Sequence, residues 1–207
     1  MIFTSTVIWQ IVCVVILSVV YASFFEWNLH RFFMHRPVWK FDYAFKAHAV
    51  VHHQTFKADH TYHLLDEKDK WTIPMAWWNG PALTAISTAM FLPFINWLFD
   101  LPFAWVFISM TIFGYYLVYE YLHWCMHLPK KRGLERSGLF FRHNGHHLLH
   151  QRYRHKDFNV VLPLADFCLG TLLRRSLVHF AQATGPAVPN VQPRHLRESE
   201  TLTQAQS

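Results

Sequence analysis

The chain opens with MIFTSTVIWQIVCVVILSVVYASFFEWNLHRFFMH, residues 1–35. Its first 25 residues carry no charge, and Glu26, His30, Arg31 and His35 follow. At about 1.5 Å per residue, a helix of that length exceeds the roughly 30 Å hydrocarbon core of a bilayer. A cleaved signal peptide carries a basic start, but no Lys or Arg precedes Arg31. The run therefore predicts a retained membrane helix.

Two further uncharged stretches cover residues 71–99 and 101–119, with only Asp100 between them. Gly80 and Pro81 suit a helix start, and Asp100-Leu101-Pro102 suits a tight turn. The two stretches therefore predict a transmembrane hairpin. Aromatic residues expected to anchor it at the lipid–water interface are Trp71, Trp77 and Trp78.

The predicted fold is an all-α, integral membrane protein in which three helices cross the bilayer below a helical, histidine-rich cap. A fourth apolar segment, residues 158–173, would make a fourth span, but Asp166 interrupts it and favours an interfacial or buried position. Residues 1–180 are expected to form a single domain. Residues 181–207, rich in Ala, Pro, Gln, Ser and Glu, predict a disordered tail.

Composition and charge agree with a membrane location. Hydrophobic residues make up 52% of the chain and charged residues 15%, against about a quarter in soluble domains. The net charge is +6, but the basic residues flank apolar runs and form no nucleic-acid-binding stripe, so nucleic acid is excluded as a partner. The positive-inside rule places the two basic segments in the cytoplasm, where they would also meet anionic lipid head groups. These segments contain Arg31, Arg36, Lys40 and Lys46, and Lys130, Lys131, Arg132, Arg136 and Arg142.

Histidine is the most over-represented residue, with sixteen copies in 207 residues. Ten of them fall into four boxes, all on the predicted cytoplasmic side. The boxes are His30/His35 (H-x4-H), His48/His52/His53 (H-x3-H-H), His123/His127 (H-x3-H) and His143/His146/His147 (H-x2-H-H). The order repeats: each half of the chain has an apolar span, a glutamate (Glu26 or Glu120), a paired box and then a triple box.

Helical geometry relates these spacings to a site. Residues three or four apart share one helix face, so His123 and His127 are predicted neighbours. His30 and His35 are about 140° apart on a regular helix, so both reach one site only if the helix is distorted or ends there. Two halves brought together would converge about ten imidazoles, enough for two metal ions.

Spacing alone leaves the metal open, because imidazole binds Fe, Zn, Cu and Ni. A catalytic site beside a bilayer that cleaves an unactivated C–H bond needs a redox metal and O2. A different class of protein, one that binds or transports metal ions across the membrane, is the alternative, although the apolar spans carry almost no polar groups.

The four boxes, in this order and split by a hairpin, resemble those of the fatty acid hydroxylase superfamily, which includes fatty-acyl and sphingolipid hydroxylases, sterol desaturases and carotenoid hydroxylases. Residues 157–171 are similar to the motif N-[YF]-G-x3-P-x-W-D-x-L-F-G-T of that family. Asp157, Asn159 and Ala165 stand where the family has Asn, Gly and Trp. Asn tolerates a left-handed backbone, so the turn is expected to survive at Asn159. Ala165 is expected to leave a smaller wall beside the substrate.

The resemblance implies an O2-dependent monooxygenase with two iron ions that hydroxylates a lipid, or desaturates it, with sterol or carotenoid oxidation as the alternative. It implies no catalytic residue beyond the metal ligands and a separate electron donor of ferredoxin or cytochrome b5 type. A bacterial inner membrane is preferred over the endoplasmic reticulum. The implied ligands are His30, His35, His48, His52, His53, His123, His127, His143, His146 and His147.

Several other residues are assigned secondary roles. His60, His63, His150 and His155 are treated as groups that support the ligands, surface residues or additional ligands. Glu26 and Glu120 are either acceptors for imidazole N–H groups or charges on a helix face. Asp166 is expected, by resemblance, to cap or orient the trailing motif.

Overall fold

The computed structural model describes residues 5–130 and 132–173, and regular structure within them is helical. One isolated bridge between Val38 and Phe41 is the only β-type pairing in that part of the chain. The all-α prediction is confirmed. The predicted tail, residues 181–207, lies outside the described residues.

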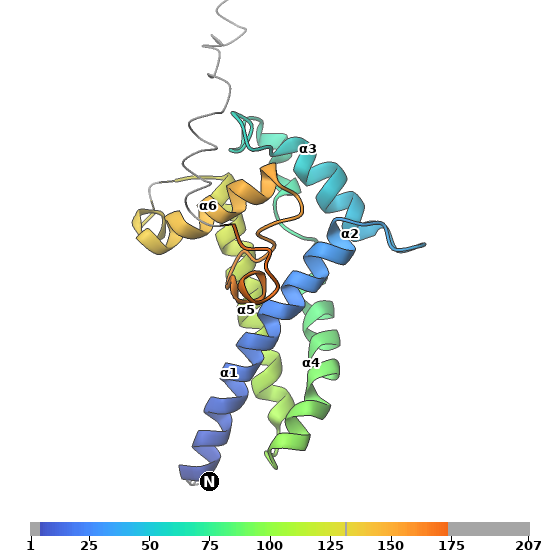
Figure 1. The fold of residues 1–207 in the computed structure, drawn as a ribbon, viewed down its shortest axis with the longest axis vertical. Coiled ribbons are helices and arrows are strands. Elements are labelled where there is room, and N and C mark those ends of the chain that lie inside the picture. The colour runs from blue at the N-terminus through green and yellow to red at the C-terminus, as the bar shows by residue number, and fades with distance from the viewer. Residues whose placement is uncertain (1–4, 131, 174–207) are drawn as a thin grey trace, which may run out of the picture. The chain divides into compact units, whose positions relative to one another are not determined.

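Three long helices lie side by side (Figure 1): α1 (Ser5–Asn28), α4 (Asn79–Leu98) and α5 (Ala104–His127). The α4–α5 hairpin forms as predicted, with its turn at residues 99–103. The shorter elements are the π-helices η1 (Leu29–Met34) and η2 (Lys46–His52), the 3-10 helices η3 (Glu67–Thr72) and η4 (Leu134–Arg136), and the α-helices α2 (Tyr43–Phe45), α3 (His53–Thr55), α6 (Gly138–Arg152) and α7 (Leu164–Cys168).

A continuous apolar core joins the long helices. Val14 of α1, Ile95 of α4 and Ile108 of α5 are completely buried and belong to one cluster. Large apolar side chains also point outward, such as Met90 (63% exposed) and Met110 (71% exposed). A helix that is apolar on all sides requires an apolar environment on its outer face as well.

Two helical segments, Ser5–Met34 and Asn79–Leu98, are long and apolar enough to cross a membrane. The predicted third span corresponds to α5, which is helical throughout but is not among these candidate spans, and Glu120 and three tyrosines occupy its second half. The second of these helices begins at Asn79, next to the helix start predicted at Gly80 and Pro81. The uncharged stretch begins earlier, at Trp71, and its first part is not in this helix. Residues 71–78 instead form the end of η3 and a turn.

Two π-helices carry the first histidine boxes. In a π-helix the hydrogen bonds run from residue i to residue i+5, so side chains five positions apart approach one another. His30 and His35 therefore stack, with ring centroids 5.1 Å apart. His48 and His53, also five apart, have Nε2 atoms 3.1 Å apart. The distortion that the His30/His35 spacing predicts is present, and a second one follows it.

Residues 157–173 return to the C-terminal end of α1 as a segment that includes α7 and is buried over residues 157–160. Trp27 donates from its indole N–H to Thr171 Oγ1 at 2.8 Å, and Phe158 and Ala165 pack on the same tryptophan. The left-handed residues of the segment are Asp157 (φ 53°) and Gly170 (φ 69°). The prediction of a left-handed Asn159 is therefore wrong. Its side chain is used instead as a hydrogen-bonding group, which donates to the Ser23 carbonyl at 2.8 Å.

Candidate metal centre

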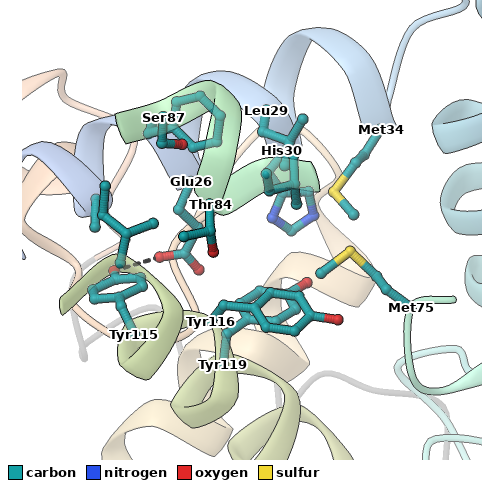
Figure 2. A pocket seen from close by; sticks show the side chains of 14 residues that line it. Glu26, Leu29, His30, Met34, Met75, Thr84, Ser87, Tyr115, Tyr116 and Tyr119 are labelled. Carbon is teal, nitrogen blue, oxygen red and sulfur yellow. Dashed lines mark hydrogen bonds between the residues drawn. The ribbon is translucent and has the colours of Figure 1, made fainter. Parts of the chain in front are cut away.

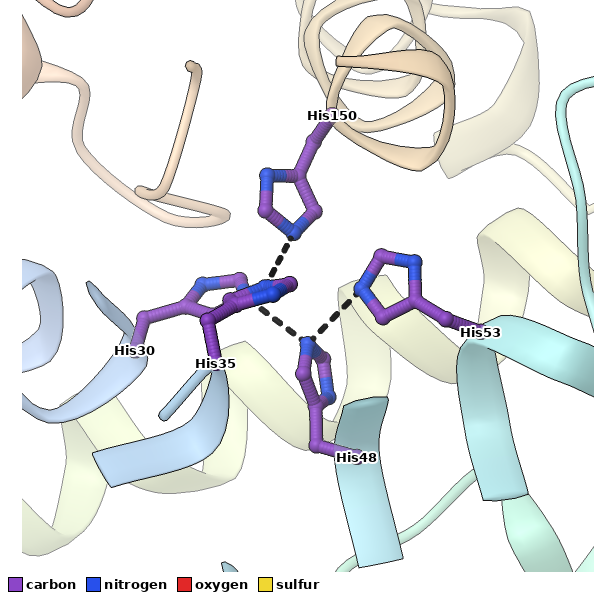
Figure 3. A group of neighbouring side chains, drawn as sticks. All are labelled: His30, His35, His48, His53 and His150. Carbon is purple, nitrogen blue, oxygen red and sulfur yellow. Dashed lines mark hydrogen bonds between the residues drawn. The ribbon is translucent and has the colours of Figure 1, made fainter. Parts of the chain in front are cut away.

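Nine histidines converge in two groups. In each group every residue offers one ligand atom within 4.8 Å of all the others. The first group contains His30, His35, His48, His53 and His150, shown in Figure 3. The second group contains His52, His123, His127 and His147. Successive residues His52 and His53 contribute to different groups, so the two groups are adjacent.

The separations between Nε2 atoms match ligands that share an ion. In the first group they are 2.8 Å for His30–His48, 3.0 Å for His35–His150 and 3.1 Å for His48–His53. In the second group they are 3.2 Å for His52–His123 and 2.9 Å for His127–His147. Two nitrogens about 2.1 Å from one ion and about 90–110° apart would themselves be about 3.0–3.4 Å apart.

Backbone carbonyls determine which nitrogen of four imidazoles carries the proton. The acceptors are the carbonyls of Phe158 for His30 (2.5 Å), Lys156 for His150 (2.7 Å), Tyr62 for His127 (2.7 Å) and Thr72 for His52 (3.3 Å). Each bond is made by Nδ1–H, which leaves Nε2 as a lone pair directed into its group. Each group therefore contains two imidazoles with a fixed, unprotonated Nε2.

Hydrogen bonds between the imidazoles cannot satisfy every ring nitrogen of the first group. His48 Nε2 lies within hydrogen-bonding distance of both His30 Nε2 and His53 Nε2 (Figure 3). One Nε2–H can be directed at only one of these neighbours. A cation bound among the lone pairs would satisfy all three, so the donor set fits a metal ion.

Burial keeps the ligands in the neutral form that binds metals. Desolvation, with added repulsion from neighbouring histidines, holds the pKa of His48, His52 and His147 well below the usual histidine value. Burial likewise lowers the pKa of His35 to about 3 and that of His150 to about 4. Both groups therefore present basic nitrogens at neutral pH, as metal binding requires.

The structure brings together eight of the ten predicted ligands. The other two, His143 and His146, lie outside both groups, and His146 Nδ1 faces the Asp157 carboxylate at 3.5 Å. His150 takes part in the first group instead. The secondary candidates His60, His63 and His155 are exposed and belong to neither group.

The register of α6 explains this difference. The H-x2-H-H spacing that the sequence shows at His143 recurs one turn later as His147, His150 and Gln151. Gln151 is buried, and its Nε2 lies 3.1 Å from His52 Nε2 and 3.3 Å from His147 Nε2. The histidine pattern does not include this residue, although the sequence shows it four residues after His147, on the same helix face.

The acidic candidates position backbone and make no hydrogen bond to imidazole among the described residues. Glu26 accepts from Tyr115 Oη at 2.7 Å and from the backbone N–H of Val160 at 2.6 Å, which ties α1 to the return segment. Glu120 accepts from the backbone N–H of Met75. Asp166, fully buried, accepts from the N–H of Phe158 at 3.0 Å and so orients the residue whose carbonyl binds His30. The expected orienting role of Asp166 agrees with these bonds.

One apolar cavity of about 860 Å³ touches both groups. Its wall includes His48 of the first group and His52 and His123 of the second. It also includes Trp77 (86% exposed) and Ile86 (52% exposed), so the cavity reaches the surface at the start of α4. A smaller space of about 60 Å³ lies between α1, α4 and α5, and His30 is part of its wall (Figure 2). Met34 and Met75 line both this space and the larger cavity.

A second opening meets the first group from another direction. This cavity, of about 430 Å³, is lined by His35 and by the three arginines Arg31, Arg36 and Arg154. Its charge contrasts with the apolar wall of the larger cavity. The two openings therefore suit different partners.

Comparisons with family models, curated proteins and solved structures found no match. The donor set itself bears on the chemistry. Nine neutral imidazoles without a carboxylate in either group suit Fe, Zn, Cu or Ni and disfavour Mg or Ca, which prefer oxygen. The described residues therefore include two adjacent histidine groups that could each hold a metal ion, and their donor atoms suit a transition metal.

Proposed function

We propose that this protein is an integral membrane, di-iron oxygenase of the fatty acid hydroxylase superfamily that uses O2 to hydroxylate a lipid chain. The observation that carries the proposal is the shared cavity: one apolar space reaches both histidine groups and opens beside α4. A metal-storage or transport site has no need of an apolar chamber of this size beside its ligands.

The outward-facing apolar residues of the long helices support the membrane assignment. Met90 of α4 and Met110 of α5 are largely exposed, and Ser5–Met34 is long enough to cross a bilayer. With α1, α4 and α5 in the bilayer, the cavity opening at Trp77 would lie at the lipid–water interface, where tryptophan is enriched. A lipid would then enter from the membrane without crossing water.

The residues themselves have three tasks. The carbonyl-anchored imidazoles hold their lone pairs toward two ions, which when bound supply the redox chemistry that activates O2 toward a C–H bond. The wall, which includes Leu83 and Ile73, holds an alkyl chain and excludes water. His48, His52 and His123 belong to the cavity wall, so an alkyl chain in the cavity would lie beside both histidine groups.

Electrons would come from a separate protein. The arginine-lined cavity at His35 supports an acidic donor of ferredoxin or cytochrome b5 type, because opposite charges steer the encounter. Hydroxylation inserts one oxygen atom of O2 into a C–H bond and reduces the other to water with electrons from this donor. Loss of a second hydrogen instead gives a double bond, so a desaturase would use the same site.

The test is lipid mass spectrometry on the native host with the gene intact, deleted, or replaced by one of three variants. His123→Ala removes a ligand, Ala82→Trp fills the cavity while leaving the ligands in place, and His60→Ala changes an exposed histidine as the control. We expect a lipid class to lose one oxygen in the deletion, His123→Ala and Ala82→Trp strains and to remain unchanged in His60→Ala.

Growth under heavy-isotope O2 identifies the source of that oxygen, which is expected to carry the label. A lipid class that gains two hydrogens in the altered strains would identify a desaturase. No lipid change together with altered metal uptake would contradict the proposal and favour the ion-binding class.

A further inference from the structure

Beside the four histidines of the second group lies a buried amide that the histidine pattern does not account for. Gln151 is 6% exposed. Its amide nitrogen lies 3.1 Å from His52 Nε2 and 3.3 Å from His147 Nε2, two members of that group. Its Oε1 is buried and has no hydrogen-bond partner among the described residues.

An unpaired buried carbonyl oxygen is costly, by about 1–3 kcal/mol, so its position requires a reason. Rotating the amide by half a turn exchanges Oε1 and Nε2 at nearly the same positions. Oε1 would then lie about 3.1–3.3 Å from the two imidazole nitrogens. That separation falls in the range of about 3.0–3.4 Å expected between two ligands of one ion.

The helix supports the same reading. On α6, His147 and Gln151 are one turn apart and share a face, while His150 reaches the first group. The first group has five imidazoles, and the second has four. Gln151 would bring the second group to five donors as well.

From this geometry we infer that Gln151 is a metal ligand of the second group through Oε1, so that one ion has five imidazoles and the other has four imidazoles and one amide oxygen. The inference rests on the proposed function only in that both groups bind metal. An amide oxygen is a weaker and harder donor than imidazole. The second group therefore binds its ion less tightly, and the two ions are taken up in sequence.

The experiment is a titration of the detergent-purified, chelator-stripped full chain with Co(II), monitored by bound cobalt and visible absorption. His35→Ala and His123→Ala assign the two binding phases to the first and second group. We expect Gln151→Leu to weaken the second phase by about 10-fold to 100-fold and to leave the first unchanged. Gln10→Leu, which removes an amide in α1 far from the histidines, is the matched control and is expected to change neither phase.

Two substitutions distinguish a ligand from a hydrogen-bond donor. Gln151→Glu keeps an oxygen and Gln151→His supplies an imidazole, so both retain the second phase if Gln151 is a ligand. If Gln151 only donates N–H to His52 and His147, Gln151→Glu fails as Gln151→Leu does, which overturns the inference. Two normal phases in Gln151→Leu also overturn it but leave the proposed function intact, whereas no cobalt bound by the unaltered chain contradicts both.

Discussion

At the scale of single residues, the backbone sets the orientation of the metal-binding imidazoles. His30, His127 and His150 each donate Nδ1–H to a carbonyl from a loop, at 2.5–2.7 Å. Carboxylates often have this role at metal sites, but a carbonyl fixes the same tautomer without adding charge. The loops that carry these carbonyls are therefore part of the site.

A substitution of Asp166 tests whether the loops orient the imidazoles. Asp166 accepts from the backbone N–H groups of Phe158 and Asn159 and from Thr171 Oγ1. Asp166→Ala leaves these buried donors unsatisfied, so we expect thermal unfolding to show a loss of about 1–3 kcal/mol or more. The first Co(II) phase should weaken at the same time, because the carbonyl that holds His30 moves.

The control is Asp59→Ala, which removes a carboxylate whose side chain is 50% exposed. We expect it to change stability by no more than about 0.5 kcal/mol. Equal losses in the two variants would show that the hydrogen bonds of Asp166 do not hold the site.

The histidine groups of the structure and the ligands predicted from the sequence differ on α6, where His143 and His150 exchange places. His150 belongs to the first group and His143 to neither, although both are buried. We expect elemental analysis to show one metal ion fewer per chain in His150→Ala and an unchanged content in His143→Ala. The reverse result would restore the box His143/His146/His147.

The sequence predicts eight of the nine histidines that the structure brings together, because paired spacing on a helix is a local property. His123 and His127 are one turn apart wherever the helix lies. Which turn of α6 faces the site depends on how α6 packs against other helices, and four histidines at helical spacing offer several registers. The spacing therefore predicts His143, which lies in neither group, as a ligand and leaves His150, about two helical turns further along α6, as a secondary candidate.

At the scale of elements, the π-helices allow one short segment to direct two imidazoles into the same histidine group. The H-x4-H spacing of His30 and His35 predicts a distorted helix. His48 and His53 have the same H-x4-H spacing, which also predicts a distorted helix. Grouping His48, His52 and His53 as one H-x3-H-H box does not lead to that prediction. In the structure that box is divided, with His52 in the other group.

Exchanging two adjacent side chains tests the π-helix directly. The double variant Met34→His with His35→Met keeps composition constant but places the second histidine four residues after His30. In η1 it is the fifth residue that faces His30, so we expect the first Co(II) phase to be lost. The second phase is the internal control, and a normal first phase would show that η1 adopts regular α-helical spacing.

At the scale of the whole molecule, the apolar exterior of α1, α4 and α5 makes the proposed membrane location testable. Met90 on α4 is 63% exposed, and Leu65 in the loop before η3 is 71% exposed. A lysine near the centre of a membrane helix costs about 2.5–3.5 kcal/mol of insertion, whereas one in water costs almost nothing. We therefore expect Met90→Lys to reduce the alkali-resistant membrane fraction and Leu65→Lys to leave it unchanged.

Equal behaviour of these two lysine variants would show that α4 does not face lipid. Hydropathy predicts the α4–α5 hairpin, but the uncharged stretch that contains α4 begins before the helix, at Trp71. The apolar residues 71–78 form part of the cavity wall instead. Hydropathy does not distinguish side chains that face lipid from those that line a chamber for an apolar molecule. In the sequence this boundary is indicated by Gly80 and Pro81 and not by hydropathy.

The absence of carboxylates from both histidine groups has a consequence for electrical balance. Two divalent cations would bring four positive charges into a buried space whose nine imidazoles supply none of the opposite sign. A buried, uncompensated charge is costly, so small anions such as hydroxide or azide should bind there tightly. Each further oxidation would increase the imbalance, and the centre should therefore rest in its reduced form and have a high midpoint potential.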